Sequence, residues 1–528
     1  MLMSLLSTNS LQLPDRAFRA GLAAVLALCC LLFVWFSRHW PLIGDASLIH
    51  YLVLLLDHGF SPYRTIIDAQ MPGTYMLDWC VVHSFGGGAV GLRIFDFTLL
   101  ALAALAMLWI TWPVDRFAGF FAASLLALLH GRDGIPQTAQ RDLIMAVLML
   151  LALAAAFHAV RRSQPGWMFL FGLCTATAAS IKPTAAPVAL LLILVAIVLR
   201  RDGRPLFWYM AWGILGLVLP CLAVTIFLIK ERSIPAFLDA LHGMWPYYAT
   251  LDNRPLGYQL LHSISPLLFL VLLWLLLLVL KVVQSRRQAA ASSPWQWERF
   301  ALWMGLALGY LSYLSQRKAY PYHRYPVLVF LLLLMALHFT EALRERGVLR
   351  LCGIIGLAAG ALIIAPMSVY KIARYDWRYD QLFTMLQGDL DHEGGASLSG
   401  HVQCLDTFAG CINTLYRMKL IESTGFLVDF YFWAPHQTPV TEQMRQRFWS
   451  DIQHNPPKVF IVMKQDWPNG PDTYGKITRW PLFANYLNQN YALVADRIAG
   501  GWVKRESRPY PPPAYRIYVR KTDAAPPA

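Results

Sequence analysis

Two aspartates stand at the start of apolar helical stretches, where a charged side chain is costly and therefore a candidate for chemistry. Asp45 opens one such stretch directly after Gly44, and Asp142 opens another. A carboxylate that caps free backbone N–H groups, or that meets the helix dipole, is one explanation for both residues. The other is proton transfer, because a carboxylate that removes the proton of an attacking nucleophile gains roughly 10²- to 10⁴-fold in rate. Asp45 is therefore a candidate general base.

Basic residues gather in short polar breaks between the apolar runs. Lys182, for example, stands before Pro183 in a tight break between two short runs. The full set is Arg64, Arg141, Lys182, Arg317, Lys318, His323 and Arg324. Taken singly, each is explained as a cation whose apolar stem lies in the membrane while its head reaches water. Taken together on one membrane face, they would form a cradle for a monophosphate or diphosphate head group. Arg93 and Asp96, within one run, are expected instead to pair with each other.

The elements that must hold these residues follow from composition. Hydrophobic residues make up 57% of the 528 residues and charged residues 14%, against about 25% charged in soluble globular chains. Apolar runs of about 18 or more residues recur between Leu22 and Ile364, long enough to cross a hydrocarbon core about 30 Å thick. Eleven spans are predicted, near residues 18–36, 91–112, 117–131, 143–160, 166–181, 184–199, 208–229, 261–281, 299–315, 325–341 and 349–369. The composition excludes a cytosolic enzyme and predicts an α-helical polytopic membrane bundle over residues 1–370.

The charges indicate the orientation of this bundle. Residues 1–370 hold 27 Lys and Arg against 16 Asp and Glu, and residues 371–528 hold 18 against 15. Arg16 and Arg19 flank the first span and no small-residue cleavage site follows it, so we expect an uncleaved anchor and a cytoplasmic amino terminus. An odd number of spans then puts the carboxyl terminus outside. The basic excess suits anionic membrane lipid, and no Lys/Arg-rich block alternating with aromatic residues indicates nucleic-acid binding.

Two outer loops have features of their own. Residues 37–90 contain apolar stretches at 46–56 and 75–82 that are too short to cross, and we expect interfacial helices there. The loop after the seventh span carries Trp245-Pro246-Tyr247-Tyr248. Stacking of Tyr247 on a sugar or contact with an isoprenoid is one explanation, and an aromatic belt at the membrane surface is the other.

The tail, residues 371–528, loses the long apolar runs. Its apolar run at 459–462 predicts a buried strand beside a helical pattern at 441–453, so we expect a small α/β domain outside the membrane. Cys404 and Cys411 lie in this tail with six residues between them. In an oxidising compartment they are predicted to form a disulfide, the alternative being two buried thiols.

An ordered set of short motifs runs through residues 15–345. It consists of Gly44-Asp45 before a helix, Gly59-x-x-x-Tyr63-Arg64, Asp68-Ala69-Gln70-Met71-Pro72-Gly73-Thr74-Tyr75, Phe85-Gly86 leading to Gly91-Leu92-Arg93, Arg141-Asp142-Leu143, Lys182-Pro183-Thr184 and Tyr322-His323-Arg324-Tyr325-Pro326. No single motif is specific. The ordered set resembles the polytopic C-type glycosyltransferases, a superfamily that includes the protein O-mannosyltransferases and the aminoarabinose transferases that modify lipid A.

The resemblance implies a polyprenyl-phosphate-linked sugar donor, a glycan, lipid or protein acceptor, and transfer at the outer face of a bacterial cytoplasmic membrane. Asp45 matches the catalytic aspartate of the family's first loop, and Asp142 matches a second acidic position that orients the acceptor or the base. Arg64 and Lys182 match positions where relatives place cations toward the lipid phosphate, and Tyr63 is grouped with them. The match of Arg317, Lys318, His323 and Arg324 is regional.

One departure from the family concerns the acceptor. Where aminoarabinose transferases carry a Glu-Lys-Pro-Pro type segment, this chain has Asp68-Ala69-Gln70-Met71-Pro72, so the lysine is absent, which argues against lipid A as the acceptor. A lipid phosphate is already a good leaving group, so a single inverting displacement needs only cations and a base. No cofactor is required, and a divalent metal is not indicated, although His50, Asp57 and His58 could bind one adventitiously.

Two other classes of protein compete with this interpretation. A lipid-linked oligosaccharide flippase or transporter would also have many spans and basic residues facing anionic lipid. Transporters often show an internal repeat and broken helices near the midplane, whereas the polar residues here collect at one face and no repeat is evident. A structural subunit that presents the tail domain would leave the acidic loop residues unexplained.

Overall fold

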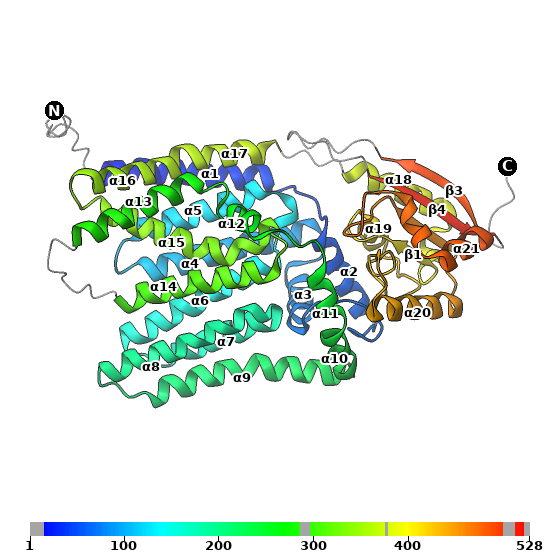
Figure 1. The fold of residues 1–528 in the computed structure, drawn as a ribbon, viewed down its shortest axis with the longest axis horizontal. Helices are drawn as coiled ribbons and strands as arrows, with labels where there is room; N and C mark the ends of the chain where they lie inside the picture. The colour runs from blue at the N-terminus through cyan, green and yellow to red at the C-terminus, as the bar shows by residue number, and fades with distance from the viewer. Residues whose placement is uncertain (1–14, 286–295, 375–378, 500–512, 522–528) are drawn as a thin grey trace. The chain divides into compact units, whose positions relative to one another are not determined.

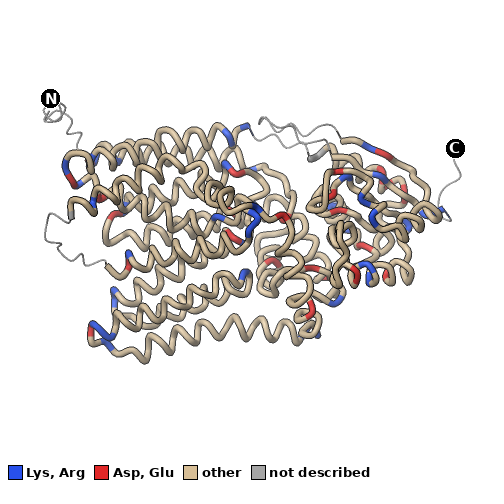
Figure 2. Tube along the Cα trace, in the orientation of Figure 1, with Lys and Arg blue, Asp and Glu red and all other residues tan. Residues whose placement is uncertain are grey.

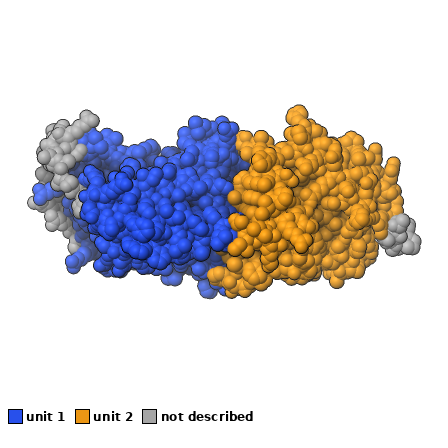
Figure 3. All heavy atoms as spheres, turned by 90° about the horizontal axis from the view of Figure 1, so that it is seen from below, with its two compact units in different colours: residues 1–39, 93–224, 254–374 blue, residues 40–92, 225–253, 375–528 orange. Residues whose placement is uncertain are grey.

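The computed structural model describes residues 15–285, 296–374, 379–499 and 513–521 (Figure 1). Contacts divide the chain into two compact units (Figure 3). Unit 1 comprises residues 1–39, 93–224 and 254–374, and unit 2 comprises residues 40–92, 225–253 and 375–528. Unit 2 therefore combines the first predicted loop, the segment after the seventh predicted span and the tail.

Unit 1 is helical throughout its described residues. Its elements are α1 (Asp15–Ser37), α4 (Ala89–Thr111, whose first turn belongs to unit 2), α5 (Arg116–Asp133), η1 (Ile135–Gln137), α6 (Arg141–Arg162), α7 (Trp167–Ile181), η2 (Pro183–Leu190), α8 (Leu191–Arg201), α9 (Phe207–Lys230, whose last residues belong to unit 2), α12 (Leu256–Ile264), α13 (Leu268–Ser285), α14 (Gln296–Gln316), η3 (Pro321–Arg324), α15 (Tyr325–Ala342), α16 (Gly347–Ala359), the π-helical turn η4 (Gly360–Ile364) and α17 (Ala365–Ala373).

Each of the eleven predicted spans is helical in the structure. Seven described helices are long and apolar enough to cross a membrane: α1, α4, α6, η2 with α8, α9, η3 with α15, and α16 continuing into α17. The bent pair α12 and α13, with 88° between its halves, makes an eighth if it counts as one span. Of the other three, α7 has 15 residues, α5 carries charges at both ends, and α14 begins with polar residues. The helical polytopic bundle is confirmed, and the number eleven stays a prediction.

Helix α15 forms the core of unit 1. It is apolar on every face, as expected of a helix surrounded by others, and 94% of its most apolar window is buried, against 17% for α9. It contacts α5, α6, α14 and α16. Charged residues are sparse along the helices of the bundle and gather toward their ends (Figure 2). Most charged residues of the bundle therefore lie at helix ends, and the apolar core fixes the positions of these helices.

Unit 2 is a mixed α/β structure. Its elements are α2 (Asp45–Asp57), α3 (Pro72–Phe85), α10 (Ile234–His242), α11 (Met244–Thr250), α18 (Tyr379–Glu393), η5 (Gly395–Leu398), β1 (Val402–Leu405), α19 (Cys411–Met418), α20 (Pro439–His454), β2 (Val459–Met463), η6 (Tyr474–Arg479), α21 (Pro481–Asn490), β3 (Tyr491–Ile498) and β4 (Ala514–Arg520). Helices α2 and α3 fall where the two short apolar stretches of the first loop predict helices. The tail contains helices and a four-stranded sheet, as predicted, whereas its separation as a domain of residues 371–528 stays a prediction.

The sheet of unit 2 has the strand order β1-β2-β4-β3. Strand β2 lies parallel to β1 and antiparallel to β4, and β3 is antiparallel to β4. All five residues of β2 are buried, which explains its uninterrupted apolar sequence. The predicted strand and helix correspond to β2 and α20, and Thr438 caps α20 by accepting a hydrogen bond from the Thr441 N–H at 3.2 Å.

A buried ion pair fixes the interior of unit 2. The Lys476 ammonium lies 2.5 Å from the Asp429 carboxylate, and the two side chains are 0% and 2% exposed. Lys476 also donates to the Leu405 carbonyl at 3.1 Å, and Asp429 accepts from the Thr407 hydroxyl and the Trp433 indole, each at 2.7 Å. A buried charge pair is tolerated when its remaining donors and acceptors are satisfied, as they are here.

Replacing one member of this pair is expected to destabilise the protein strongly. Asp429→Ala removes the ion-pair partner of the buried Lys476, a change that typically costs about 3–5 kcal/mol. Asp496→Ala is the matched control, because its partner Arg516, 2.9 Å away, is partly exposed and such pairs contribute about 0–1 kcal/mol. The thermal midpoint of the purified full-length protein, followed by tryptophan fluorescence, should fall much further for Asp429→Ala. Equal falls would contradict the role given to the buried pair.

Candidate functional site

A carboxylate and an ammonium meet at one end of the unit 1 helices. Asp142 lies in the first turn of α6, and Lys182 follows the last residue of α7, where Pro183 starts η2 and prevents α7 from continuing. The Lys182 ammonium is 2.6 Å from the Asp142 carboxylate. The Asp142 side chain is 1% exposed and the Lys182 side chain 19%, so the accessible member of the pair is the cation.

Gln316, the last residue of α14, completes a triangle with this pair. Its side-chain carbonyl accepts a hydrogen bond from Lys182 at 2.6 Å, and its amide donates to the second carboxylate oxygen of Asp142 at 3.3 Å. Both Asp142 oxygens therefore accept hydrogen bonds, which suits an orienting carboxylate better than a proton acceptor. Sequence reasoning missed Gln316 because a neutral amide gives no charge signal, although it directly precedes Arg317-Lys318.

Other predicted cations lie around the same triangle. Lys318 and His323 are both buried, each with 4% of its surface exposed. Arg141, Lys182 and Lys318 all lie close enough to His323 to act electrostatically on its ring. The Nδ1 atom of His323 is buried and has no hydrogen-bond partner among the described residues. Three cations of the predicted set thus lie near His323, and one of them, Lys182, is also paired with Asp142. Such an arrangement suits an anionic ligand such as a phosphate.

Two other predicted cations have structural contacts. Arg324 forms a two-pronged ion pair with Asp133, at 2.8 and 2.5 Å, and donates to the carbonyl oxygens of His262 and Ser265. It therefore joins the start of α15 to the end of α5 and to the break between α12 and α13. Arg317 has a positive φ of 57°, and its carbonyl accepts a hydrogen bond from the Arg254 N–H at 2.8 Å. These contacts shape the loop that presents Lys318 and His323.

A buried network holds the loop that leads into Asp142. Asp96, fully buried in α4, accepts from Arg93 at 2.8 Å and from the Ala139 N–H at 2.7 Å, and lies 3.1 Å from His130. The Nδ1 of His130 is 2.6 Å from the Tyr325 hydroxyl. The predicted pair of Arg93 and Asp96 is confirmed, whereas the contacts with His130, Ala139 and Tyr325 lie too far apart in sequence to be predicted. The network anchors the turn at Ala139, which has a positive φ of 48°.

Asp45 belongs to unit 2. It is the first residue of α2 and is half-buried, while Gly44, with a positive φ of 59°, occupies the N-cap position. Asp45 is therefore not the capping residue itself, and its charge lies in the first turn, where the helix dipole favours it. The N-cap interpretation of Asp45 is therefore wrong, and its role as a general base stays a prediction.

The remaining predicted residues also lie in unit 2. Arg64 is exposed and donates to the Glu231 carbonyl at 3.3 Å. Tyr63 is buried; its hydroxyl donates to the Gln70 carbonyl at 2.5 Å, and its ring packs against Tyr75 and Phe237 with centroids 5.6 and 5.2 Å away. The ring of Tyr247 is half-buried, 5.6 Å from that of Tyr431. Tyr63 thus shapes the loop beside Arg64, and Tyr247 packs against the tail.

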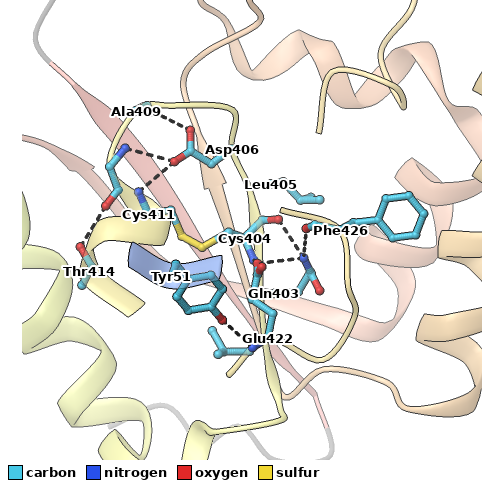
Figure 4. The surroundings of a disulfide bond; sticks show 12 residues. Tyr51, Gln403, Cys404, Leu405, Asp406, Ala409, Cys411, Thr414, Glu422 and Phe426 are labelled. Carbon is cyan, nitrogen blue, oxygen red and sulfur yellow. Dashed lines mark hydrogen bonds between the residues drawn. A yellow bond between two sulfur atoms is a disulfide. The ribbon is translucent and has the colours of Figure 1, made fainter. Parts of the chain in front are cut away.

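The tail cysteines and the metal candidates can be placed as well. Cys404 and Cys411 form a disulfide between β1 and α19 (Figure 4). Within the described residues, no group of three or more His, Cys, Asp or Glu side chains could hold a metal ion. His50, one of the adventitious metal candidates, is buried in α2 and bonds the Ala46 carbonyl at 2.8 Å through Nδ1.

Comparisons with known proteins identify the fold. No protein-family model matches the sequence, and no curated protein does. Among solved structures, ArnT from Cupriavidus metallidurans, bound to undecaprenyl phosphate, matches with a TM-score of 0.56 at 13% identity, over 96% of this chain and 99% of that one. The Archaeoglobus fulgidus oligosaccharyltransferase, tethered to an acceptor peptide, matches with a TM-score of 0.50 at 12% identity, over 84% of this chain and 69% of that one.

The chain has the fold of the polytopic C-type glycosyltransferases, as the ordered motifs predict. The match to ArnT covers nearly the full length of both chains. The shared fold therefore extends beyond the membrane helices to the α/β tail.

The environment of His50 predicts a pH dependence of stability. Burial, together with the nearby charge of Lys419, lowers the pKa of His50 to about 4. The unfolded chain, in which histidine has a pKa of about 6.5, binds more protons between pH 6.5 and 4, so stability is lost as the pH falls through this window. A shift of this size corresponds to about 3 kcal/mol.

His50→Gln is expected to remove this part of the pH dependence. Thermal midpoints of the purified protein at pH 7 and pH 4.5 should differ more for the wild type than for the variant, because only the wild type has to protonate a buried ring. Each protein serves as its own reference at pH 7, so a constant loss of stability in the variant does not affect the comparison. The same pH dependence in both proteins would contradict the assignment to His50.

Proposed function

We propose that this protein is a membrane glycosyltransferase that moves a sugar from a polyprenyl-phosphate-linked donor to a glycan, lipid or protein acceptor. One observation carries the proposal: Arg141, Lys182 and Lys318 lie near His323, and Lys182 is held by Asp142 and Gln316, in a chain with the C-type glycosyltransferase fold. A lipid phosphate is the anion that such a site would meet in a membrane. ArnT, which has this fold, was solved with undecaprenyl phosphate bound.

The reaction is a single displacement at the anomeric carbon of the donor sugar. A hydroxyl oxygen or amide nitrogen of the acceptor attacks this carbon as the bond from the carbon to the phosphate oxygen breaks. The electron pair of that bond leaves with the polyprenyl phosphate, and the proton of the nucleophile passes to a carboxylate. One displacement inverts the anomeric centre. Cations that meet the departing phosphate stabilise the charge that develops on it.

The residues of the chain divide between these tasks. Lys182, Arg141, Lys318 and His323 are proposed to bind the lipid phosphate, with Asp142 and Gln316 holding the lysine in place. Asp45 is proposed as the base, because it matches the catalytic aspartate of the first loop in the family that the ordered motifs resemble. Arg64 is assigned to the donor phosphate as a second cation, and Tyr247 to the sugar or isoprenoid.

Orientation and chain organisation are part of the same proposal. Eleven crossings, with the amino terminus in the cytoplasm, place the reaction, the first loop and the tail on the outer face of a bacterial cytoplasmic membrane. The transmembrane part would be residues 1–370, and the tail would be an extracytoplasmic domain of residues 371–528. The tail, which offers no catalytic motif in the sequence, would cover the site or bind the acceptor.

A deletion strain tests the proposal against the alternative, a lipid-linked oligosaccharide flippase. Mass spectrometry of its lipids and envelope glycans should show one missing sugar substituent and accumulation of the corresponding polyprenyl-phosphate sugar. Purified protein in proteoliposomes should then transfer that sugar from the extracted donor lipid to the acceptor. Movement of the lipid-linked sugar across the vesicle without any transfer would identify a flippase and overturn the proposal.

Asp45→Asn is expected to abolish transfer. The amide keeps the bulk of the side chain but cannot accept the proton, so turnover should fall at least about 10²-fold. Native mass spectrometry with undecaprenyl phosphate should show unchanged binding, since the base does not hold the donor phosphate. Near wild-type turnover in the purified variant would exclude Asp45 as the base.

Lys182→Ala is expected to weaken the use of the lipid donor more than the use of the acceptor. It removes a cation from the phosphate site and leaves the buried Asp142 without its ion-pair partner, so a loss of stability should accompany the loss of donor binding. The matched variant Lys182→Arg keeps the charge with a different shape. Turnover measured against donor concentration and against acceptor concentration separates the effect on donor use from the effect on acceptor use. An unchanged dependence on donor would contradict a phosphate contact.

A further inference from the structure

Asn413 of the tail holds the segment that carries Asp45. The Asn413 side chain is 2% exposed, and its amide donates to the Leu42 carbonyl and, at 2.8 Å, to the Ser47 hydroxyl. These two acceptors lie on either side of Asp45 in the sequence, before and after the Gly44 turn that starts α2. One side chain therefore spans the turn from which Asp45 projects.

A second contact ties α2 to the tail. The Tyr51 hydroxyl, fully buried in α2, accepts a hydrogen bond from the Glu422 N–H at 2.9 Å (Figure 4). The Glu422 carboxyl in turn accepts from the Cys404 N–H at 2.8 Å and from the Gln403 amide at 2.9 Å. The middle of α2 is thus connected, through one residue, to strand β1.

The Asn413 contact and the Glu422 contact both lead to the Cys404–Cys411 disulfide. Cys404 is the residue whose N–H Glu422 binds, and Cys411 is the first residue of α19, the helix that carries Asn413. Asp406, between the two cysteines, accepts hydrogen bonds from the N–H groups of Ala409 and Cys411 at 2.7 and 2.9 Å, directly before and at the start of α19 (Figure 4). The same loop and the start of α2 line one small pocket, which includes Gly44, Ser47, Asp406, Thr407 and Asn413.

We propose that Asn413 is a positioning residue for glycosyl transfer, which sets the place of Asp45 from a helix whose start is fixed by the Cys404–Cys411 disulfide. The proposal rests on the role of Asp45 as the base. A general base must lie within hydrogen-bond reach of the proton that it removes, and a displacement of about 1 Å can cost 10²-fold in rate. A buried clamp on both sides of the Gly44 turn is suited to hold that position.

Asn413→Ala tests the proposal. It removes both hydrogen bonds to the start of α2, so turnover should fall about 10- to 100-fold, while native mass spectrometry with undecaprenyl phosphate shows unchanged binding. Hydrogen exchange of the amides from Leu42 to Leu48 should speed up in the variant. This second measurement does not depend on any reaction.

Two further variants separate positioning from folding. Asn469→Ala is the matched control, because Asn469 also donates its amide to a backbone carbonyl, that of Phe430 at 2.9 Å, but does so away from α2. Its turnover should stay within about twofold of the wild type. Ser47→Ala removes only one of the two hydrogen-bond acceptors of Asn413. Its loss of turnover should therefore be smaller than that of Asn413→Ala. In the double variant the two losses should not add, because both changes remove the same contact.

Replacement of both cysteines tests whether the disulfide fixes the start of α19. Cys404→Ser with Cys411→Ser should speed the same amide exchange and lower turnover in the same direction as Asn413→Ala, at equal donor binding. Loss of turnover in Asn413→Ala no greater than in Asn469→Ala, or unchanged exchange at Leu42 to Leu48, would overturn the proposal. Absence of transfer by the wild type itself would instead overturn the proposed function, whereas the exchange measurement would still decide whether Asn413 holds the turn.

Discussion

The cost of placing a charge inside an apolar helix bundle governs the structure of unit 1. Asp142 is almost fully buried at the end of α6, and it is stable there because Lys182 and Gln316 together satisfy both of its oxygens. These three residues come from the ends of α6, α7 and α14, so the pairing also fixes three helix ends against one another. Loss of the Lys182 charge would leave the buried Asp142 without its ion-pair partner.

The neighbouring contacts support this pairing. Asp96 holds the turn at Ala139, which determines where α6 begins and hence where Asp142 lies. Arg324, paired with Asp133, fixes the other side of the site at the start of α15. Because α15 is buried on all faces, its start can move little without disturbing the apolar core. The basic side chains near Lys182 are therefore presented by rigid elements, which favours recognition of an anion at a fixed position.

Hydrophobicity and charge made part of the structure predictable from the sequence, whereas contacts made by neutral or distant partners were missed. Apolar run length placed the eleven helical segments and strand β2, and sparse charges drew attention to Asp142 and Lys182. The roles of Gln316 and Asn413 are not predictable from the sequence, because an uncharged amide has no distinctive pattern until its hydrogen-bond partners are known. The Asn413 contact with Leu42 joins residues 371 positions apart, and no spacing rule reaches across that distance. The motif around Arg64 groups Tyr63 with the substrate residues, whereas the Tyr63 hydroxyl and ring are engaged in contacts within unit 2.

The order of the chain has a consequence for how unit 2 must form. Helix α2 is made early, but the residues that hold it, Asn413 and Glu422, lie 366 to 371 positions later. Contacts of such long sequence separation form late, because the entropy of closing the intervening chain must be overcome first. The segment that carries Asp45 therefore cannot reach its final conformation until the tail has folded. If Asp45 is the base, the α/β tail is needed for catalysis even though it supplies no reacting group, since the geometry of the first loop depends on it.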